Sequence, residues 1–193
     1  MRMPGLGGEV MNRMGVAIVN MPGGEIFTSL QSGAIDATEW IGPYNDLAFG
    51  LHQAAEYYYY PGWHEPTVMF EAIVNDEALA ELPADLQAIL RTAVRDVNQD
   101  VLDEYTARNN DALATLINEH DVQLRKLPDD VLAQAQEISA EVVQELADSS
   151  DIAGRIYESY RDFQDKVVNY HAISEQAYYN ARNPDGGTDF GQE

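Results

Sequence analysis

The chain has 193 residues, 45% of them hydrophobic, which is enough for one domain or two small lobes with a substantial core. Its 33 acidic and 11 basic residues give a formal net charge of −22, and a field of this sign repels nucleic acid and anionic lipid, which are excluded as partners. The absence of cysteine excludes disulfides, thiolate metal sites and a cysteine nucleophile.

Short helices and strands alternate at the start of the chain. The sequence predicts a helix over residues 5–14, a strand over 16–19, a helix over 25–31 and a strand over 35–41. Gly33 suits the end of the second helix, because glycine readily adopts the left-handed backbone conformation that closes many helices. Strands and helices that alternate over such short intervals favour parallel βαβ units, so the predicted fold class is α/β.

The following region, up to residue 75, is irregular and rich in aromatic residues. The run Tyr57–Tyr60 is predicted to be a strand with both faces covered, since its rings point alternately to the two sides. Another strand is predicted over residues 67–74 from its β-branched and apolar residues.

Long helices dominate from Pro83 onward. The spacing of apolar side chains predicts a helix from Pro83 toward His120, a strand over residues 122–127, a helix from Pro128 to about residue 146 and a last helix over residues 152–181. Apolar residues of the last helix follow an a/d-like spacing, which predicts that this helix spans both lobes or packs on a partner.

Two charged residues are candidate binding groups. Arg2 lies beside a glycine-rich helix start, where a guanidinium and free N–H groups suit a carboxylate. Glu39 precedes Trp40 in an otherwise apolar strand, and a carboxylate in that place must be protonated, paired or bound to a cation. The alternative is that Glu39 is the solvent-exposed end of a strand.

The polar groups near Glu39 in the sequence all offer oxygen atoms. They belong to Asp36, Thr38, Asn45 and Asp46. Oxygen donors favour Na⁺ or Ca²⁺ over zinc, and the four histidines of the chain show no paired spacing that would suggest a zinc hydrolase. No nucleophile elbow, P-loop or complete dinucleotide-binding motif is present in the sequence.

Three segments together resemble the solute-binding proteins of TRAP (tripartite ATP-independent periplasmic) transporters. They are residues 2–8 (RMPGLGG), residues 24–44, which include SGAIDATEWIGPY, and residues 57–63 (YYYYPGW). The resemblance extends over residues 1 to about 182 and is nearest to the branch that binds 2-oxo and 2-hydroxy monocarboxylates with a metal cation. It implies a periplasmic-binding-protein-like fold of two lobes, incomplete here, which closes on a small carboxylate and is not an enzyme.

The resemblance implies roles for five residues of this chain. Arg2 is expected to clamp the ligand carboxylate. Glu39 is expected to coordinate one Na⁺ or Ca²⁺ ion, and Trp40 to give that ion its backbone carbonyl and to pack beside the ligand. The ion is expected to bridge to the carboxylate and to the 2-oxo or 2-hydroxy oxygen of the ligand. Trp63 and His64 are expected in the wall of the pocket, although close relatives often carry an aromatic residue at the position of His64.

The resemblance also implies the organisation of the chain. Residues 1–41 are expected to form part of the second lobe, residues 42–127 a hinge-crossing segment and part of the first lobe, residues 128–182 C-terminal helices with a long dimerisation helix, and residues 183–193 a disordered tail. Family members begin with a signal peptide and most of a first lobe. The chain is therefore expected to be the C-terminal portion of a periplasmic protein, without the glutamine that normally completes the cation shell.

The expected partners are a small organic carboxylate, the TRAP membrane subunits and a second copy of the chain. Three alternatives stay open. A TRAP binding protein for a C4-dicarboxylate or another organic acid needs no metal, and a helical dimerisation module needs no ligand. An enzyme acting on a small carboxylate would use Glu39 and Asp36 for acid–base chemistry.

Overall fold

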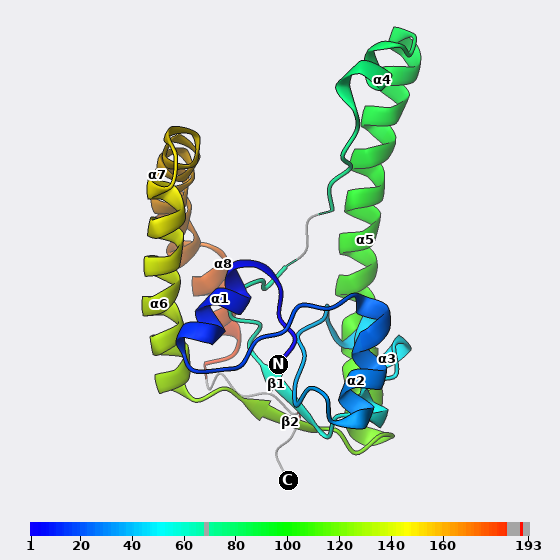
Figure 1. Cartoon of the computed structure of the whole chain (residues 1–193), viewed down its shortest axis with the longest axis vertical. Coiled ribbons are helices and arrows are strands. Elements are labelled where there is room, and N and C mark those ends of the chain that lie inside the picture. The colour runs from blue at the N-terminus through cyan, green and yellow to red at the C-terminus, as the bar shows by residue number, and fades with distance from the viewer. Residues whose placement is uncertain (68–69, 185–189, 191–193) are drawn as a thin grey trace. The chain divides into compact units, whose positions relative to one another are not determined.

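The computed structural model describes residues 1–67, 70–184 and 190, and the chain divides into two compact units (Figure 1). The first unit comprises Met1–Glu39 and Leu124–Glu193, and the second comprises Trp40–Gln123, so the chain crosses from one unit to the other twice. Helices and short strands share the chain, which confirms the predicted α/β class. No helix of the described residues is both long and apolar enough to span a lipid bilayer.

In the first unit, the backbone of Arg2 lies between two neighbouring segments. It forms parallel bridges with Val19 and with Thr38. The N–H of Arg2 donates to the carbonyl oxygen of Ala37 (2.9 Å), and the N–H of Glu39 donates to the carbonyl oxygen of Arg2 (3.0 Å). The parallel pairing expected of βαβ units is therefore present, with Arg2 in its centre.

The helices of this region occur where the sequence predicts them. They are α1 (Gly5–Arg13) and α2 (Ile26–Ser32), and the short 3₁₀ helix η1 (Gly23–Glu25), which the sequence does not predict, precedes α2. Gly33 closes α2 in the left-handed conformation, with φ +73°. The predicted strands over residues 16–19 and 35–41 are each reduced to a single bridge, because α1 begins so soon after Arg2 that the central segment offers little backbone for pairing.

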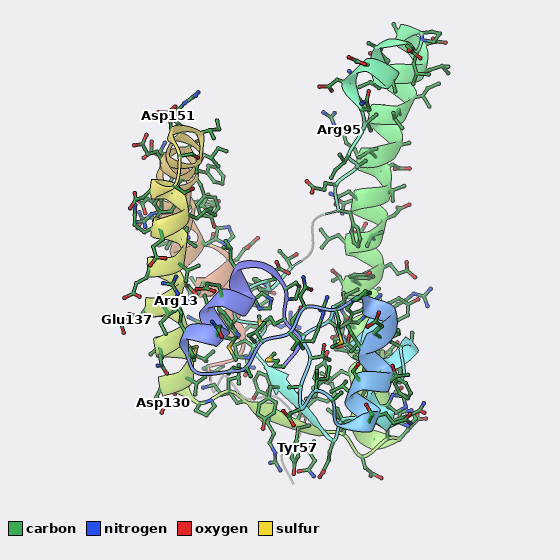
Figure 2. All side chains as sticks on the ribbon, viewed as in Figure 1. Arg13, Tyr57, Arg95, Asp130, Glu137 and Asp151 are labelled. Atoms are coloured by element: carbon green, nitrogen blue, oxygen red, sulfur yellow. The ribbon has the colours of Figure 1, made fainter. Side chains whose placement is uncertain are left out.

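The described residues of the C-terminal part include a short strand and three helices. They are β2 (Gln123–Lys126), α6 (Asp129–Asp148), α7 (Asp151–Ile173) and α8 (Glu175–Arg182). α6 packs against both α1 and α7. Figure 2 shows Arg13 at the α1 side of α6, where its guanidinium donates to both carboxylate oxygens of Glu145 (2.8 and 2.7 Å). This exposed ion pair is one of the contacts between α1 and α6.

The last predicted helix, over residues 152–181, is wrong as a single helix, because the structure divides it at Ser174. The Oγ of Ser174 donates to the carbonyl oxygen of Tyr170 (2.8 Å). Its N–H is shared between the carbonyl oxygens of Tyr170 (3.1 Å) and His171 (3.2 Å). A serine that bonds back to the preceding turn competes with the helical pattern, and α7 ends there.

The second unit is built on one long helix. α5 (Ala84–Asn118) follows Pro83, which confirms the predicted long helix, and α3 (Pro43–Ala48) packs against it. The unit also contains the 3₁₀ helix η2 (Leu51–Gln53), β1 (Tyr57–Tyr60) and α4 (Asp76–Ala80). Figure 1 shows α4 beside the N-terminal end of α5. The N–H of Gln123, at the start of β2, donates to the carbonyl oxygen of Glu56 (2.9 Å), directly before β1.

Two predictions for this unit are wrong. The described part of residues 67–74 forms no strand, and the N–H of Phe70 donates to the side chain of Asn98 on α5 (2.8 Å). Tyr57 and Tyr59 are 48% and 56% exposed, so β1 is not covered on both faces. The reason is that, among the described residues, β1 pairs only with β2, and no further strand covers it. The predicted tail over residues 183–193 falls mostly outside the described residues.

Candidate functional site

The guanidinium of Arg2 is buried and turned toward Glu39. Arg2 is 8% exposed. Its Nη1 donates to the main-chain carbonyl oxygen of Glu39 at 2.7 Å and to the carboxylate oxygen Oε2 of the same residue at 3.3 Å. In a chain of net charge −22, this buried positive group is the local feature that can bind an anion against the overall field.

The side chain of Glu39 is partly buried, with 22% of it exposed. The main-chain atoms of Glu39 are held firmly. Its N–H donates to the carbonyl oxygen of Arg2 (3.0 Å), and its own carbonyl oxygen accepts from the hydroxyl of Thr38 (2.9 Å) as well as from Arg2. The structure therefore brings together the two charged residues that the sequence marks as anion-binding and cation-binding groups.

Trp40 begins the second unit, and its indole stacks on Phe49. The ring centroids lie 5.4 Å apart, and the planes are inclined by 22°. Phe49 directly follows α3 and acts as its C-cap, with its N–H donating to the carbonyl oxygen of Asn45 (2.8 Å). The indole of Trp40 is thus held by an aromatic side chain that is itself fixed by a helix end.

Asp46 bonds the turn after Trp40, a role that the sequence did not predict. Its side-chain Oδ1 accepts the N–H groups of Ile41 and Gly42, each at 3.3 Å, and its Oδ2 accepts the hydroxyl of Tyr58 at 2.6 Å. Asp46 is 7% exposed. The sequence suggested Asp46 as a possible cation donor. In the structure its carboxylate instead accepts hydrogen bonds from the turn that follows Trp40.

The electrostatics of this cluster follow from burial. Burial raises the pKa of Asp46, while the hydrogen bonds from Tyr58, Ile41 and Gly42 act in the opposite direction. Burial and the adjacent Asp46 carboxylate also raise the pKa of Tyr58, which keeps its phenol protonated as a donor. Asp46 lies in the first turn of a helix that begins after Gly42 with Pro43. A carboxylate at such a position often caps the helix start, and this signal could have indicated that Asp46 bonds the preceding backbone.

Trp63 and His64 form an aromatic pair in the second unit. Their ring centroids lie 5.1 Å apart with the planes inclined by 51°. Burial lowers the pKa of His64, and Glu65 counteracts this only in part. The buried Nδ1 of His64 has no hydrogen-bond partner among the residues that the structure describes. A neutral imidazole beside an indole is suited to the wall of a pocket.

A cavity of about 150 Å³ lies between the segments that follow Trp40 and His64 and the face of α5. It is lined by Ile41, Gly42, Glu65, Pro66, Thr67, Val101, Leu102, Tyr105, Thr106 and Asn109. The loop after Trp40 and the loop after His64 therefore line the same cavity, although they lie more than 20 positions apart in the sequence.

The donor set at Glu39 and Trp40 consists of oxygen atoms. A carboxylate and a backbone carbonyl suit hard cations such as Na⁺ or Ca²⁺, which take oxygen ligands. Among the described residues, no three histidine, aspartate or glutamate side chains converge in a geometry that could hold a metal ion. The described residues thus supply oxygen atoms of the kind that such cations bind, but no cluster of three acidic or histidine side chains.

Comparison with known proteins gives a consistent result. The family model described as bacterial extracellular solute-binding protein, family 7, matches residues 1–150. A curated relative, a monocarboxylate 2-oxoacid-binding periplasmic protein from Nostoc sp. (strain PCC 7120), is 39% identical over 180 residues. These residues cover 93% of this chain and 49% of the relative.

Two solved structures show the same fold. A TRAP transporter solute binding protein from Bordetella bronchiseptica RB50, described as a mixed occupancy dimer with calcium and picolinate, matches with a TM-score of 0.88 and 33% identity over 96% of this chain and 55% of that one. A TRAP periplasmic solute binding protein from Pseudoalteromonas atlantica T6c, with bound sodium and pyruvate, matches with a TM-score of 0.84 and 35% identity over 93% of this chain and 55% of that one. The chain spans about half the length of these relatives.

Proposed function

The chain belongs to the bacterial extracellular solute-binding proteins of family 7, and from this premise we propose that it is part of the periplasmic solute-binding subunit of a TRAP transporter. The protein captures a small 2-oxo or 2-hydroxy carboxylate, such as pyruvate or lactate, together with one Na⁺ or Ca²⁺ ion, and delivers it to the membrane subunits. The observation that carries this proposal is the contact between buried Arg2 and Glu39.

Arg2 binds the carboxylate of the ligand. A guanidinium can give two parallel N–H bonds to a carboxylate, and its burial strengthens the attraction because little water screens it. The anchoring of Arg2 by the carbonyl oxygen of Glu39 fixes the direction in which the guanidinium points. This preorganisation lowers the entropic cost of ligand binding.

Glu39 and Trp40 hold the cation, Glu39 with its carboxylate and Trp40 with its backbone carbonyl. These two donors fit Na⁺ or Ca²⁺ in chemistry, as described above. When bound, the cation supplies positive charge for the carboxylate and the 2-oxo or 2-hydroxy oxygen of the ligand. Trp63 and His64 contribute to the pocket wall, where the half-buried, neutral imidazole can offer a hydrogen bond to a ligand oxygen.

The function is one of binding and release without catalysis. The description of the family as solute-binding proteins supports this part of the proposal. The relatives with sodium and pyruvate or with calcium and picolinate support a monocarboxylate ligand and a cation.

The exposed apolar face of α7 supports a dimer. Its members are Ile152, Ile156, Tyr160, Phe163, Tyr170 and Ile173, each at least 56% exposed. An apolar stripe of this kind on a helix is typical of a helix–helix interface, and a second copy of the chain is the proposed occupant. The Bordetella relative described as a dimer is consistent with this assignment.

Isothermal titration of the longest natural form of the protein that contains this chain tests the function. Pyruvate, lactate and longer 2-oxoacids are titrated in Na⁺ buffer, in Ca²⁺ buffer, and in a K⁺ buffer with EDTA. Binding of one of these acids that requires Na⁺ or Ca²⁺ is expected. Cation-independent binding would favour the metal-free organic-acid alternative, and no binding of any carboxylate would refute the proposal.

A further inference from the structure

The peptide unit between Trp40 and Ile41 has its direction fixed by a buried side chain. This peptide is not among the cis bonds of the described residues, and in a trans peptide the C=O and N–H groups lie in one plane and point in opposite directions. The N–H of Ile41 donates to Oδ1 of Asp46 at 3.3 Å. The carbonyl oxygen of Trp40, which belongs to the same peptide unit, therefore points away from Asp46.

We propose that Asp46 is a positioning residue that aims the carbonyl oxygen of Trp40 at the cation. The inference rests on the proposed function, which assigns this carbonyl to the cation. Asp46 does not touch the ion. It acts by holding the N–H of Ile41, and the neighbouring N–H of Gly42, on one carboxylate oxygen. With two consecutive N–H groups anchored, the Trp40–Ile41 peptide has little freedom to rotate.

Asp46 is itself held from the opposite side. The hydroxyl of Tyr58 on β1 donates to Oδ2 at 2.6 Å, which leaves Oδ1 for the turn. The N–H of Asp46 donates to the carbonyl oxygen of Gly42 (2.9 Å), so backbone and side chain of the same residue both bond the turn. A buried carboxylate with all of these partners has a defined position, which is what a positioning residue needs.

The helix that carries Asp46 is fixed on α5 by two further hydrogen bonds. The N–H of Tyr44 donates to Oδ1 of Asn109 (3.0 Å), and the side-chain amide of Asn45 donates to the hydroxyl of Tyr105 (3.2 Å). Both donors directly precede Asp46 on α3. The position of Asp46 therefore derives from α5, the longest helix of the second unit.

The same short helix also holds the indole of Trp40. Phe49, which caps α3, stacks on this ring with a centroid distance of 5.4 Å. Trp40 is thus constrained twice, through its backbone by Asp46 and through its side chain by Phe49. Groups that orient a metal ligand in this way typically contribute about 10- to 100-fold to metal affinity.

The test compares three substitutions with a matched control. Asp46→Ala removes the acceptor, Asp46→Asn keeps an oxygen that can accept both N–H groups, and Tyr58→Phe removes only the hydroxyl behind Asp46. Asp100→Asn, at an exposed position on α5, removes one negative charge elsewhere in the same unit. Ca²⁺ alone and Na⁺ alone are titrated calorimetrically into the longest natural form of each protein.

We expect Asp46→Ala to weaken cation binding by about 10- to 100-fold, with Asp46→Asn recovering most of this loss and Asp100→Asn binding as the wild type does. At saturating cation the carboxylate affinity of Asp46→Ala should return to the wild-type value, which a merely misfolded pocket would not show. Exchange of the Ile41 and Gly42 amide protons, followed by NMR without ligand, should accelerate in Asp46→Ala and not in Asp46→Asn.

The outcomes separate the inference from the proposed function. A wild type that binds neither cation refutes the proposed function. A wild type that binds a cation, with Asp46→Ala equally tight or Asp46→Asn as weak as Asp46→Ala, overturns the positioning role alone. Where Asp46→Ala fails to fold, Tyr58→Phe decides: the loss of one hydrogen bond predicts about fivefold weaker cation binding, and unchanged binding overturns the inference.

Discussion

Nη1 of Arg2 lies 2.7 Å from the main-chain carbonyl oxygen of Glu39 and 3.3 Å from its carboxylate oxygen Oε2. One nitrogen of the proposed anion-binding group is thus shared with the proposed cation-binding residue. A carboxylate ligand that approaches Arg2 meets competition from the carboxylate of Glu39. A cation on Glu39 offsets that negative charge, so cation and carboxylate are expected to strengthen each other's binding by the same factor.

Glu39→Gln is expected to remove the cation dependence of carboxylate binding. The variant keeps the carbonyl oxygen that anchors Arg2 but loses the charged donor for the ion. Titration of pyruvate with and without the cation should give two equal and weak affinities. Glu77→Gln, at an exposed position on α4, is the control and should keep the wild-type difference. A Glu39→Gln protein that still needs the cation contradicts the assignment.

Arg2→Gln is expected to weaken carboxylate binding by about 10- to 100-fold, the size typical of losing a hydrogen bond to a charged group. Arg2→Lys should recover only part of the loss, because an ammonium cannot make two parallel bonds to a carboxylate. The control is Arg91→Gln on α5, where the arginine is exposed. Calorimetry at saturating cation separates this effect from any effect on the ion, and equal affinities for Arg2→Gln and wild type would refute the role.

Gly8→Ala is expected to lower the free energy of unfolding by about 1–3 kcal/mol, the usual cost of overpacking. A Cβ at position 8 would collide with the backbone carbonyl oxygen of Met3, and a backbone atom cannot move aside as a flexible side chain can. Gly24→Ala is the matched control, because a Cβ there meets no atom within 4 Å. Urea unfolding measures both variants, and equal stability would show that α1 shifts freely.

Stability is expected to fall as the pH decreases below about 6.5, the ordinary pKa of histidine. Burial, and then His120 with its ring centroid 4.0 Å away, lower the pKa of His52. Between these two pKa values the unfolded chain therefore binds a proton at His52 that the folded chain does not bind. The resulting contribution to folding stability is present at higher pH and is lost as the pH falls. His52→Gln should reduce this slope in urea unfolding compared between about pH 7.5 and about pH 5.5, whereas an unchanged slope argues against His52 as a source.

Phe163→Asp is expected to convert a dimer into a monomer without loss of fold. Phe163 is 67% exposed in the single chain, so a charge there removes little intramolecular packing but would be buried in the interface. Analytical ultracentrifugation gives the mass of each protein, with Glu158→Gln on the same helix as control. A wild type that sediments as a monomer removes the dimer proposal.

Most helices could be predicted because their boundaries are marked by local signals. Gly33, Pro83 and Pro128 each end or begin a helix as expected, and the backbone chemistry of glycine and proline explains this within a few residues. The break at Ser174 carries no glycine or proline, and it depends on the bond of the Ser174 hydroxyl back to Tyr170, which the sequence alone does not reveal. The described part of residues 67–74 forms no strand, although its composition favours one, because the described residues offer it no strand to pair with.

The candidate site was predictable in its residue types but not in its contacts. Arg2 and Glu39 are recognisable as unusual charges, whereas their contact spans 37 positions and depends on parallel bridges that place their backbones side by side. The link from Asp46 to Tyr58 is harder still, because tyrosines in a run of four look alike in the sequence and only one of them reaches the carboxylate.

The attachment of α3 to α5 has a consequence for protein engineering. The bond from Tyr44 to Asn109 spans 65 positions, and through α3 it sets where Asp46 and Phe49 stand. The side chains of α5 that bond α3 therefore offer a way to change the position of Asp46, and with it the direction of the Trp40 carbonyl. Variant libraries that probe the proposed binding function can therefore include Asn109 and Tyr105 along with Arg2 and Glu39.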